Sequence, residues 1–100
     1  MSRHTYLWEF LVKPGSEVEF IKHYGPEGTW VQLFRQAPGF METLFLKDSE
    51  SPRRYVTLDR WRSAAEYQTF RTRFTRQYQK LDEVCGGLTI SETYLGTFSE

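Results

Sequence analysis

Hydrophobic and polar residues alternate with a period of two in four segments of the chain, a pattern typical of β-strands with one buried face. The first segment covers residues 5–13 and ends at Pro14 and Gly15, which favour a turn. The other three segments cover residues 40–47, 54–61 and 88–98. A polar turn over residues 48–52 separates the second and third segments, so we expect these two strands to form a hairpin.

Two segments between these strands have the three- and four-residue hydrophobic spacing of amphipathic helices. Each begins with a serine, Ser16 or Ser63, followed three residues later by a glutamate, and this spacing lets both side chains bond free N–H groups of the first turn. In the first segment, residues 24–28 contain two glycines and a proline and predict an interruption. In the second segment, the hydrophobic stripe continues from Tyr67 to Leu81 and predicts one long helix.

The resulting order is strand, helix, strand, strand, helix, strand. This βαββαβ order predicts an α+β fold of the ferredoxin-like type, a four-stranded antiparallel sheet with both helices on one face. The length is that of one domain, and no linker, repeat or low-complexity stretch interrupts it. We therefore expect residues 1–100 to form a single domain.

The chain has 13 basic and 13 acidic residues, and so no net charge that would attract a nucleic acid or an anionic membrane. No apolar run approaches the roughly 20 residues that span a bilayer, and the first residues lead into a strand rather than into an apolar signal segment. Cys85 is the only cysteine, so it has no partner for an internal disulfide. We expect a cytoplasmic protein without nucleic-acid or membrane partners, in which Cys85 is a buried, inert thiol.

Aromatic residues make up 17% of the chain and occur in every predicted element, more than one side of so small a sheet should bury. In the third predicted strand, Val56 and Leu58 share one face, which we expect beneath the helices. The opposite face, expected to be free of helices, has a polar and aromatic set: Tyr55, Thr57, Asp59 and Trp61. Exposed aromatic surface favours aggregation, so we expect a homodimer whose two sheets enclose a shared lumen.

A family likeness spans essentially the whole chain. The residues that carry it are Trp8 to Phe10, Val12 to Gly15, Tyr24 with Gly25, Gly28 to Trp30, Pro38 to Phe40, Tyr55 to Trp61, Ser63, Tyr78, Leu81 with Asp82, and Leu88 to Phe98. Together they resemble the antibiotic biosynthesis monooxygenase domain of the dimeric α/β-barrel superfamily. The resemblance implies a dimeric α/β barrel that binds a small aromatic substrate.

Family members that oxidise polycyclic phenols without a cofactor use an asparagine, a tryptophan four residues later and a tyrosine six residues beyond that. The resemblance places Thr57, Trp61 and Tyr67 at these three positions. A threonine hydroxyl donates one hydrogen bond to an oxyanion, whereas an amide donates two and reaches further. Haem-degrading relatives use a histidine in the second helix, and residues 63–81 contain none, which disfavours haem oxygenation.

The candidate catalytic residues are Asp59, Trp61 and Tyr67. Asp59 is a general base if burial raises its pKa toward neutrality, or else it forms an ion pair with Arg60, Arg62 or another arginine. Trp61 lines a pocket and orients an oxygenated ligand, or it packs in a dimer core. Tyr67 donates a hydrogen bond in the pocket, or it begins the hydrophobic stripe of its helix.

The candidate substrate-binding residues are Tyr55, Thr57, Glu9 and Glu92. Tyr55 and Thr57 share the face of Trp61, although both residue types also simply favour strands. Glu9 and Glu92 lie in otherwise apolar strands, where each either faces the ligand or is a hydrogen-bonded structural carboxylate.

Few other groups suggest a site. A solvated helix face explains the basic run of the second helix, Arg71, Arg73, Arg76 and Lys80, and only Arg71 and Arg73 are candidates for the mouth of a ligand site. His4 and His23 are separated by a whole strand, with no cysteine or carboxylate at metal-ligand spacing, so we expect no metal site. No glycine loop of the phosphate-binding kind is present, and we expect no haem, flavin or other cofactor.

Two functions remain open at this point. One is a cofactor-independent monooxygenase that acts on a small aromatic or polycyclic phenolic metabolite in the pocket of a homodimer. The other is a non-oxidative binder, isomerase or cyclase of a hydrophobic metabolite, which acts by proton transfer alone or not at all. Oxygen consumption separates the two.

Overall fold

The computed structural model describes residues 2–100. Its elements are β1 (His4–Val12), α1 (Glu17–Tyr24), α2 (Thr29–Phe34), β2 (Phe40–Lys47), β3 (Arg54–Trp61), α3 (Ala64–Arg73), α4 (Thr75–Cys85) and β4 (Thr89–Ser99). The four strands and the two helical segments occur in the predicted order. Each helical segment is divided into two helices, and the sequence predicts only the division between α1 and α2.

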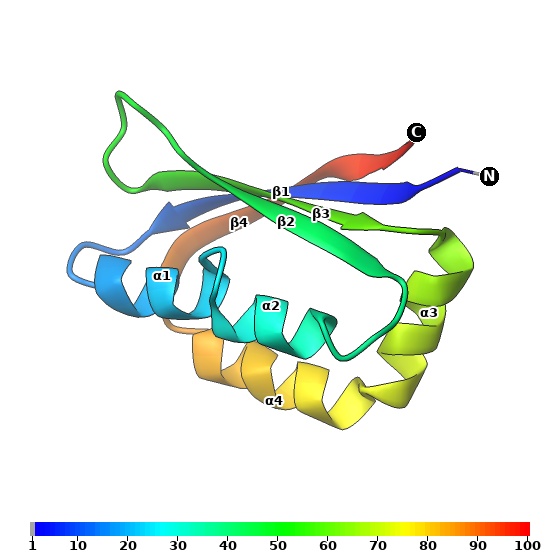
Figure 1. Cartoon of the computed structure of the whole chain (residues 1–100). Coiled ribbons are helices and arrows are strands. Elements are labelled where there is room, and N and C mark those ends of the chain that lie inside the picture. The colour runs from blue at the N-terminus through cyan, green and yellow to red at the C-terminus, as the bar shows by residue number, and fades with distance from the viewer. Residues whose placement is uncertain (1) are drawn as a thin grey trace.

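The strands form one antiparallel sheet in the order β2-β3-β1-β4. All four helices lie on the same face of this sheet, and the two chain ends lie close together at one end of it (Figure 1). The predicted ferredoxin-like α+β fold is therefore confirmed. Within residues 2–100, no helix has the length and apolar character needed to cross a membrane.

The two serine-led helix starts differ in their hydrogen bonds. At α3, the Ser63 side chain accepts a bond from the backbone N–H of Glu66 at 3.2 Å, as predicted. At α1, the Ser16 side chain makes no capping bond, and Glu17 instead accepts from the backbone N–H of Gly15 at 2.8 Å. Gly15 has a φ of +85°, a conformation that suits glycine, so a turn rather than a capping box sets the entry to α1.

The second helical segment breaks at Phe74, whose φ of −111° lies outside the helical range. The Thr75 hydroxyl donates to the backbone carbonyls of Arg71 at 2.6 Å and Thr72 at 3.0 Å. Such side-chain bonds compete with the backbone ladder and bend helices. The break lets α3 descend from the end of β3 while α4 runs below α2 (Figure 1).

The helices cover the opposite sheet face from the one predicted. Trp61 is completely buried, and its ring centroid lies 4.9 Å from that of Phe70 on α3. Tyr55 stacks on Phe20 of α1 at 5.1 Å. The alternation correctly predicts that Tyr55, Thr57, Asp59 and Trp61 share a face, but that face lies beneath the helices. The period of two determines which residues share a face, not which face the helices cover, and a cavity beneath the helices accommodates the polar members of the set.

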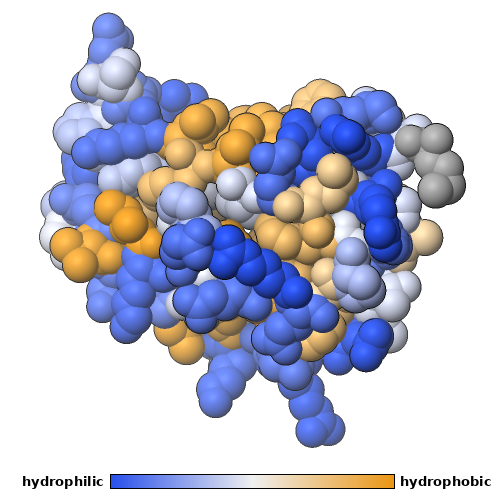
Figure 2. All heavy atoms as spheres, viewed as in Figure 1, coloured by the Kyte–Doolittle hydropathy of each residue, from blue (hydrophilic) through white to orange (hydrophobic). Residues whose placement is uncertain are grey.

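The helix-free face has a row of leucines instead, flanked by the ion pairs Arg54–Glu9 and Arg60–Glu42. Leu44, Leu58 and Leu7 stand opposite one another on three neighbouring strands. Leu46 and Phe98 are 54% and 51% exposed. Figure 2 shows hydrophobic surface along the top of the molecule, where this face is seen edge-on.

Candidate functional site

Strand register places three polar side chains in one row on the helix-covered face. Asp59 on β3 pairs directly with Tyr6 on β1 and with Thr43 on β2. The next row brings Thr57 of β3 opposite Trp8 of β1. Directly opposed residues on neighbouring strands lie close enough for their side chains to touch, so these two rows form one continuous floor.

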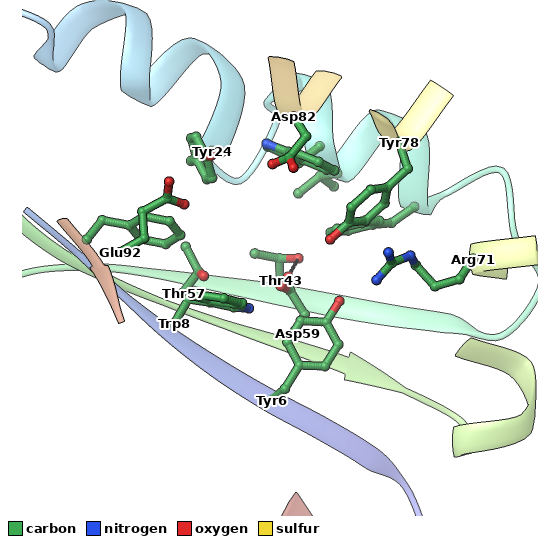
Figure 3. A pocket seen from close by; sticks show the side chains of 14 residues that line it. Tyr6, Trp8, Tyr24, Thr43, Thr57, Asp59, Arg71, Tyr78, Asp82 and Glu92 are labelled. Atoms are coloured by element: carbon green, nitrogen blue, oxygen red, sulfur yellow. Dashed lines mark hydrogen bonds between the residues drawn. The ribbon is translucent and has the colours of Figure 1, made fainter. Parts of the chain in front are cut away.

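Above this floor, between the sheet and the helices, is a cavity of about 270 Å³. Its polar lining residues, all labelled in Figure 3, are Tyr6, Tyr24, Thr43, Thr57, Asp59, Arg71, Tyr78, Asp82 and Glu92. Its apolar lining residues are Trp8, Phe10, Trp30, Val31 and Phe34. Aromatic walls with a few convergent polar groups are typical of small-molecule sites.

Asp59 is the buried carboxylate of this cavity, with 6% of its surface exposed. Burial raises its pKa to about 7, and a hydrogen bond from the Thr43 hydroxyl acts in the opposite direction (Figure 3). Among residues 2–100, no arginine, lysine or histidine forms an ion pair with it; Arg60 binds Glu42 and Glu100, and Arg62 binds Glu66. The alternative of an arginine partner is therefore wrong, and burial is the main cause of the raised pKa of Asp59.

Tyr6 lies beside Asp59 and is 7% exposed. Its hydroxyl oxygen accepts a hydrogen bond of 3.3 Å from the indole Nε1–H of Trp61. Burial raises the pKa of Tyr6 well above its usual value, and the neighbouring Asp59 raises it further, so the hydroxyl keeps its proton. The Trp61 N–H uses a lone pair of the Tyr6 oxygen and not its proton. The Tyr6 hydroxyl can therefore donate its own hydrogen bond to another acceptor in the cavity.

Two further carboxyl groups line the cavity. Asp82 of α4 and Glu92 of β4 both line it. Burial raises the pKa of Glu92, and the nearby Asp82 adds to the increase, while a hydrogen bond from Thr89 opposes it. Trp30 adds a buried indole N–H that has no acceptor within residues 2–100. The cavity therefore has two further carboxyl groups and one indole donor without a partner.

The structure brings together only some of the predicted site residues. Asp59, Thr57 and Glu92 line the cavity. The other predicted residues do not line it: Trp61, Tyr67, Tyr55 and Glu9. Trp61 and Tyr67 pack against each other directly behind Tyr6, with ring centroids 5.3 Å apart.

Glu9 and Tyr55 lie away from the cavity for different reasons. Glu9 lies on the helix-free face, where it accepts a hydrogen bond of 2.7 Å from Nε of Arg54. It is therefore a paired structural carboxylate, which was one of its two alternatives. Tyr55 packs against both Phe20 and Phe45, with centroid distances of 5.1 and 5.2 Å, and belongs to the core.

Several cavity residues escape sequence reasoning, among them Tyr6, Thr43, Tyr78 and Asp82. Tyr6 belongs to an alternating strand, but only the register reveals that it faces Asp59. Tyr78 and Asp82 are four residues apart, a spacing that places them on one face of α4. That spacing is the one sequence signal that could have pointed to them. Of the two arginines expected near a ligand mouth, Arg71 lines the cavity and Arg73 does not.

The described part of the chain has no cluster of metal-binding side chains. Within residues 2–100, no three histidine, cysteine, aspartate or glutamate side chains cluster as metal ligands would. Cys85 is buried, and burial raises the pKa of its thiol, which disfavours a reactive thiolate.

The fold and the cavity define an α+β domain of the ferredoxin-like type with a ligand-sized site between sheet and helices. The profile of the antibiotic biosynthesis monooxygenase family matches residues 5–80, and the chain belongs to this family. A search of curated proteins finds no significant match.

Solved structures support the same fold. A variant of SnoaB, a cofactor-independent oxygenase from Streptomyces nogalater, with an asparagine-to-alanine substitution superposes with a TM-score of 0.84 at 16% identity, over 100% of this chain and 94% of that one. SnoaB itself gives 0.76 at 15% identity, with the same coverage. A Bordetella bronchiseptica protein assigned as an antibiotic biosynthesis monooxygenase gives 0.69 at 20% identity, over 100% and 96% of the two chains.

Proposed function

We propose that this protein is a cofactor-independent monooxygenase that oxidises a small aromatic or polycyclic phenol in the cavity between its sheet and its helices. The observation that carries the proposal is Asp59, a buried carboxyl with a pKa of about 7 inside an aromatic-walled cavity. Such a group is half ionised near neutral pH, which is the condition that general base catalysis requires. Family membership and the similarity to SnoaB support the same reaction class.

In the proposed reaction, Asp59 removes a proton from an activated CH₂ group of the phenolic substrate. The carbanion gives electrons to dioxygen, a C–O bond forms, and the proton returns to give a hydroperoxide. Loss of the second C–H proton with cleavage of the O–O bond leaves a carbonyl and one water. Four electrons leave the substrate and reduce dioxygen to these two products, so the step needs no other reductant.

Tyr6 has a separate role in this scheme. Removal of the substrate proton places negative charge on the conjugated oxygen, and a donor aimed at that oxygen stabilises it. The Tyr6 hydroxyl supplies that donor because Trp61 already bonds its oxygen. Trp61 then acts through Tyr6 as a positioning residue, and the aromatic walls exclude water from the reactive anion.

The same two groups also suit a reaction without oxygen. A base and a neighbouring neutral donor are sufficient for an isomerase or cyclase that moves a proton on a similar skeleton. Thr57, in place of the asparagine of the phenol-oxidising relatives, is compatible with this alternative.

Oxygen uptake tests the proposal. Purified protein with an anthrone, which has the activated CH₂ group, is expected to consume one dioxygen per anthraquinone formed, as measured with an oxygen electrode and by product absorbance. Asp59→Asn is expected to lower kcat by roughly a hundredfold or more. The control is Val56→Ala on the helix-free face, which should leave kcat unchanged. Product formation without oxygen uptake would establish the proton-transfer alternative and refute the oxygenase.

We further propose that the helix-free face joins two copies of the chain into a homodimer. The row formed by Leu44, Leu58 and Leu7 continues toward Leu46 and Phe98, two side chains that are about half exposed. An exposed hydrophobic row of this kind favours self-association. Each cavity then belongs to one subunit rather than to a lumen shared by both.

A further inference from the structure

Arg71 on α3 is a cavity-lining arginine without a carboxylate partner. Within residues 2–100, no aspartate or glutamate lies within ion-pair distance of its guanidinium. Four arginines of the described chain each bind at least one carboxylate: Arg35, Arg54, Arg60 and Arg62. Of the arginines without such a partner in residues 2–100, Arg71 is the one that lines the cavity. The positive charge of Arg71 is therefore available to an anion that enters the cavity.

Two tyrosines hold the Arg71 guanidinium in place. Its carbon lies 3.9 Å from the centroid of the Tyr78 ring, a cation–π arrangement. One of its N–H groups donates to the Tyr67 hydroxyl at 3.0 Å. A guanidinium has five N–H donors in a planar fork, so this contact leaves most of them unused.

The charges of the cavity are separated along its length. Arg71 enters from the α3 side, whereas Glu92 enters from β4 at the other end and Asp82 from above (Figure 3). Among the described residues, neither Asp82 nor Glu92 forms an ion pair. An anionic substituent is repelled by the two carboxylates and attracted by the arginine, so only one orientation of an acidic ligand is favourable.

We propose that Arg71 is a specificity-determining residue that binds a carboxylate substituent of the aromatic substrate. The planar N–H groups of the Arg71 guanidinium match the two oxygens of a carboxylate. With its carboxylate at Arg71, the aromatic ring of the substrate lies over Thr57 and Trp8, which line the same cavity. This inference rests on the proposed function, because it presumes that the cavity binds an aromatic molecule. It adds that this molecule is an aromatic acid and that Arg71 sets its orientation.

The test compares two ligands of nearly equal shape, 3-hydroxy-2-naphthoate and 3-hydroxy-2-naphthamide, by isothermal titration calorimetry. The protein is expected to bind the carboxylate roughly tenfold more tightly than the amide, a typical effect of one charge-assisted contact. Arg71→Gln is expected to remove this preference while amide binding changes little. Arg73→Gln, on the same helix but outside the cavity, is the matched control and should keep the preference.

The outcomes separate the two proposals. Equal affinity of the protein for both ligands, or a preference that survives Arg71→Gln in a folded variant, overturns the role of Arg71 and leaves the oxygenase proposal intact. If neither ligand binds, the aromatic site itself is wrong and both proposals fail. Circular dichroism of each variant confirms that loss of binding is not loss of fold.

Discussion

The indole Nε1–H of Trp61 donates a hydrogen bond to the hydroxyl oxygen of Tyr6 across 3.3 Å, and this bond joins the buried core to the cavity. Trp61 is completely buried, whereas Tyr6 borders the cavity. Trp61, which the sequence places among the candidate pocket residues, therefore lies one residue away from the cavity. The side chain that borders the cavity is Tyr6, from the first strand.

Tyr6→Phe tests this relationship because it removes the hydroxyl and keeps the ring. We expect kcat to fall by about a hundredfold with little change in KM, since one donor to the developing oxyanion is lost. Trp61→Phe should also lower kcat, but the double variant should be no slower than Tyr6→Phe alone, because both act through one oxygen. Steady-state kinetics of the three variants measure this. Additive losses would mean that Trp61 acts independently of Tyr6.

Trp61→Ala is a poor substitute for this experiment. Truncation of a fully buried tryptophan costs about 3–5 kcal/mol of folding free energy, so a loss of activity would reflect loss of structure.

The pH dependence of kcat/KM should follow Asp59. A base must be ionised to accept a proton, so activity is expected to be low below neutrality and to rise through a pKa of about 7. Thr43→Val removes the hydrogen bond that lowers this pKa, so the rise should move to higher pH. A pH series of initial rates with both proteins checks this. A profile that is flat from pH 5 to 9, or a shift to lower pH in Thr43→Val, would contradict the assignment of Asp59 as the base.

Thr57→Asn tests whether the cavity shares its geometry with the phenol-oxidising relatives. Thr57 is buried on the cavity floor, where an amide would offer two donors in place of one. One well-placed oxyanion donor contributes on the order of 3 kcal/mol, so anthrone oxidation is expected to rise by up to about a hundredfold. Thr57→Val, of similar size but without a donor, is the control. A rise in both variants would point to a change of shape rather than to the amide.

Association through the helix-free face should respond to a single charge. Leu44→Lys places an ammonium group in the aliphatic row and is expected to give a monomer at micromolar concentration by light scattering, where the unaltered protein is a dimer. Val18→Lys, at a position 81% exposed on α1, should leave the dimer intact. If the protein without substitutions is itself monomeric at this concentration, the proposed dimer is refuted.

Much of the fold could be predicted from the sequence because the signals are local. Alternation over residues 54–61 correctly places Tyr55, Thr57, Asp59 and Trp61 on one face, and the glycines and proline of residues 24–28 predict the break between α1 and α2. The break at Phe74 was missed, because the Thr75 bonds to Arg71 and Thr72 that accompany it leave no mark in the hydrophobic spacing.

The candidate site depended on more than local pattern. The sequence by itself determined the order of the elements, the residues that share a face and the presence of Asp59 and Thr57 among them. Only the tertiary structure decided that the helices cover this face, that Tyr6 and Thr43 flank Asp59 in the register, and that Arg71 reaches the same cavity. The physical reason is that side-chain alternation is a property of one strand, whereas strand register, layer packing and the burial that raises the pKa of Asp59 arise from contacts between residues far apart in the chain.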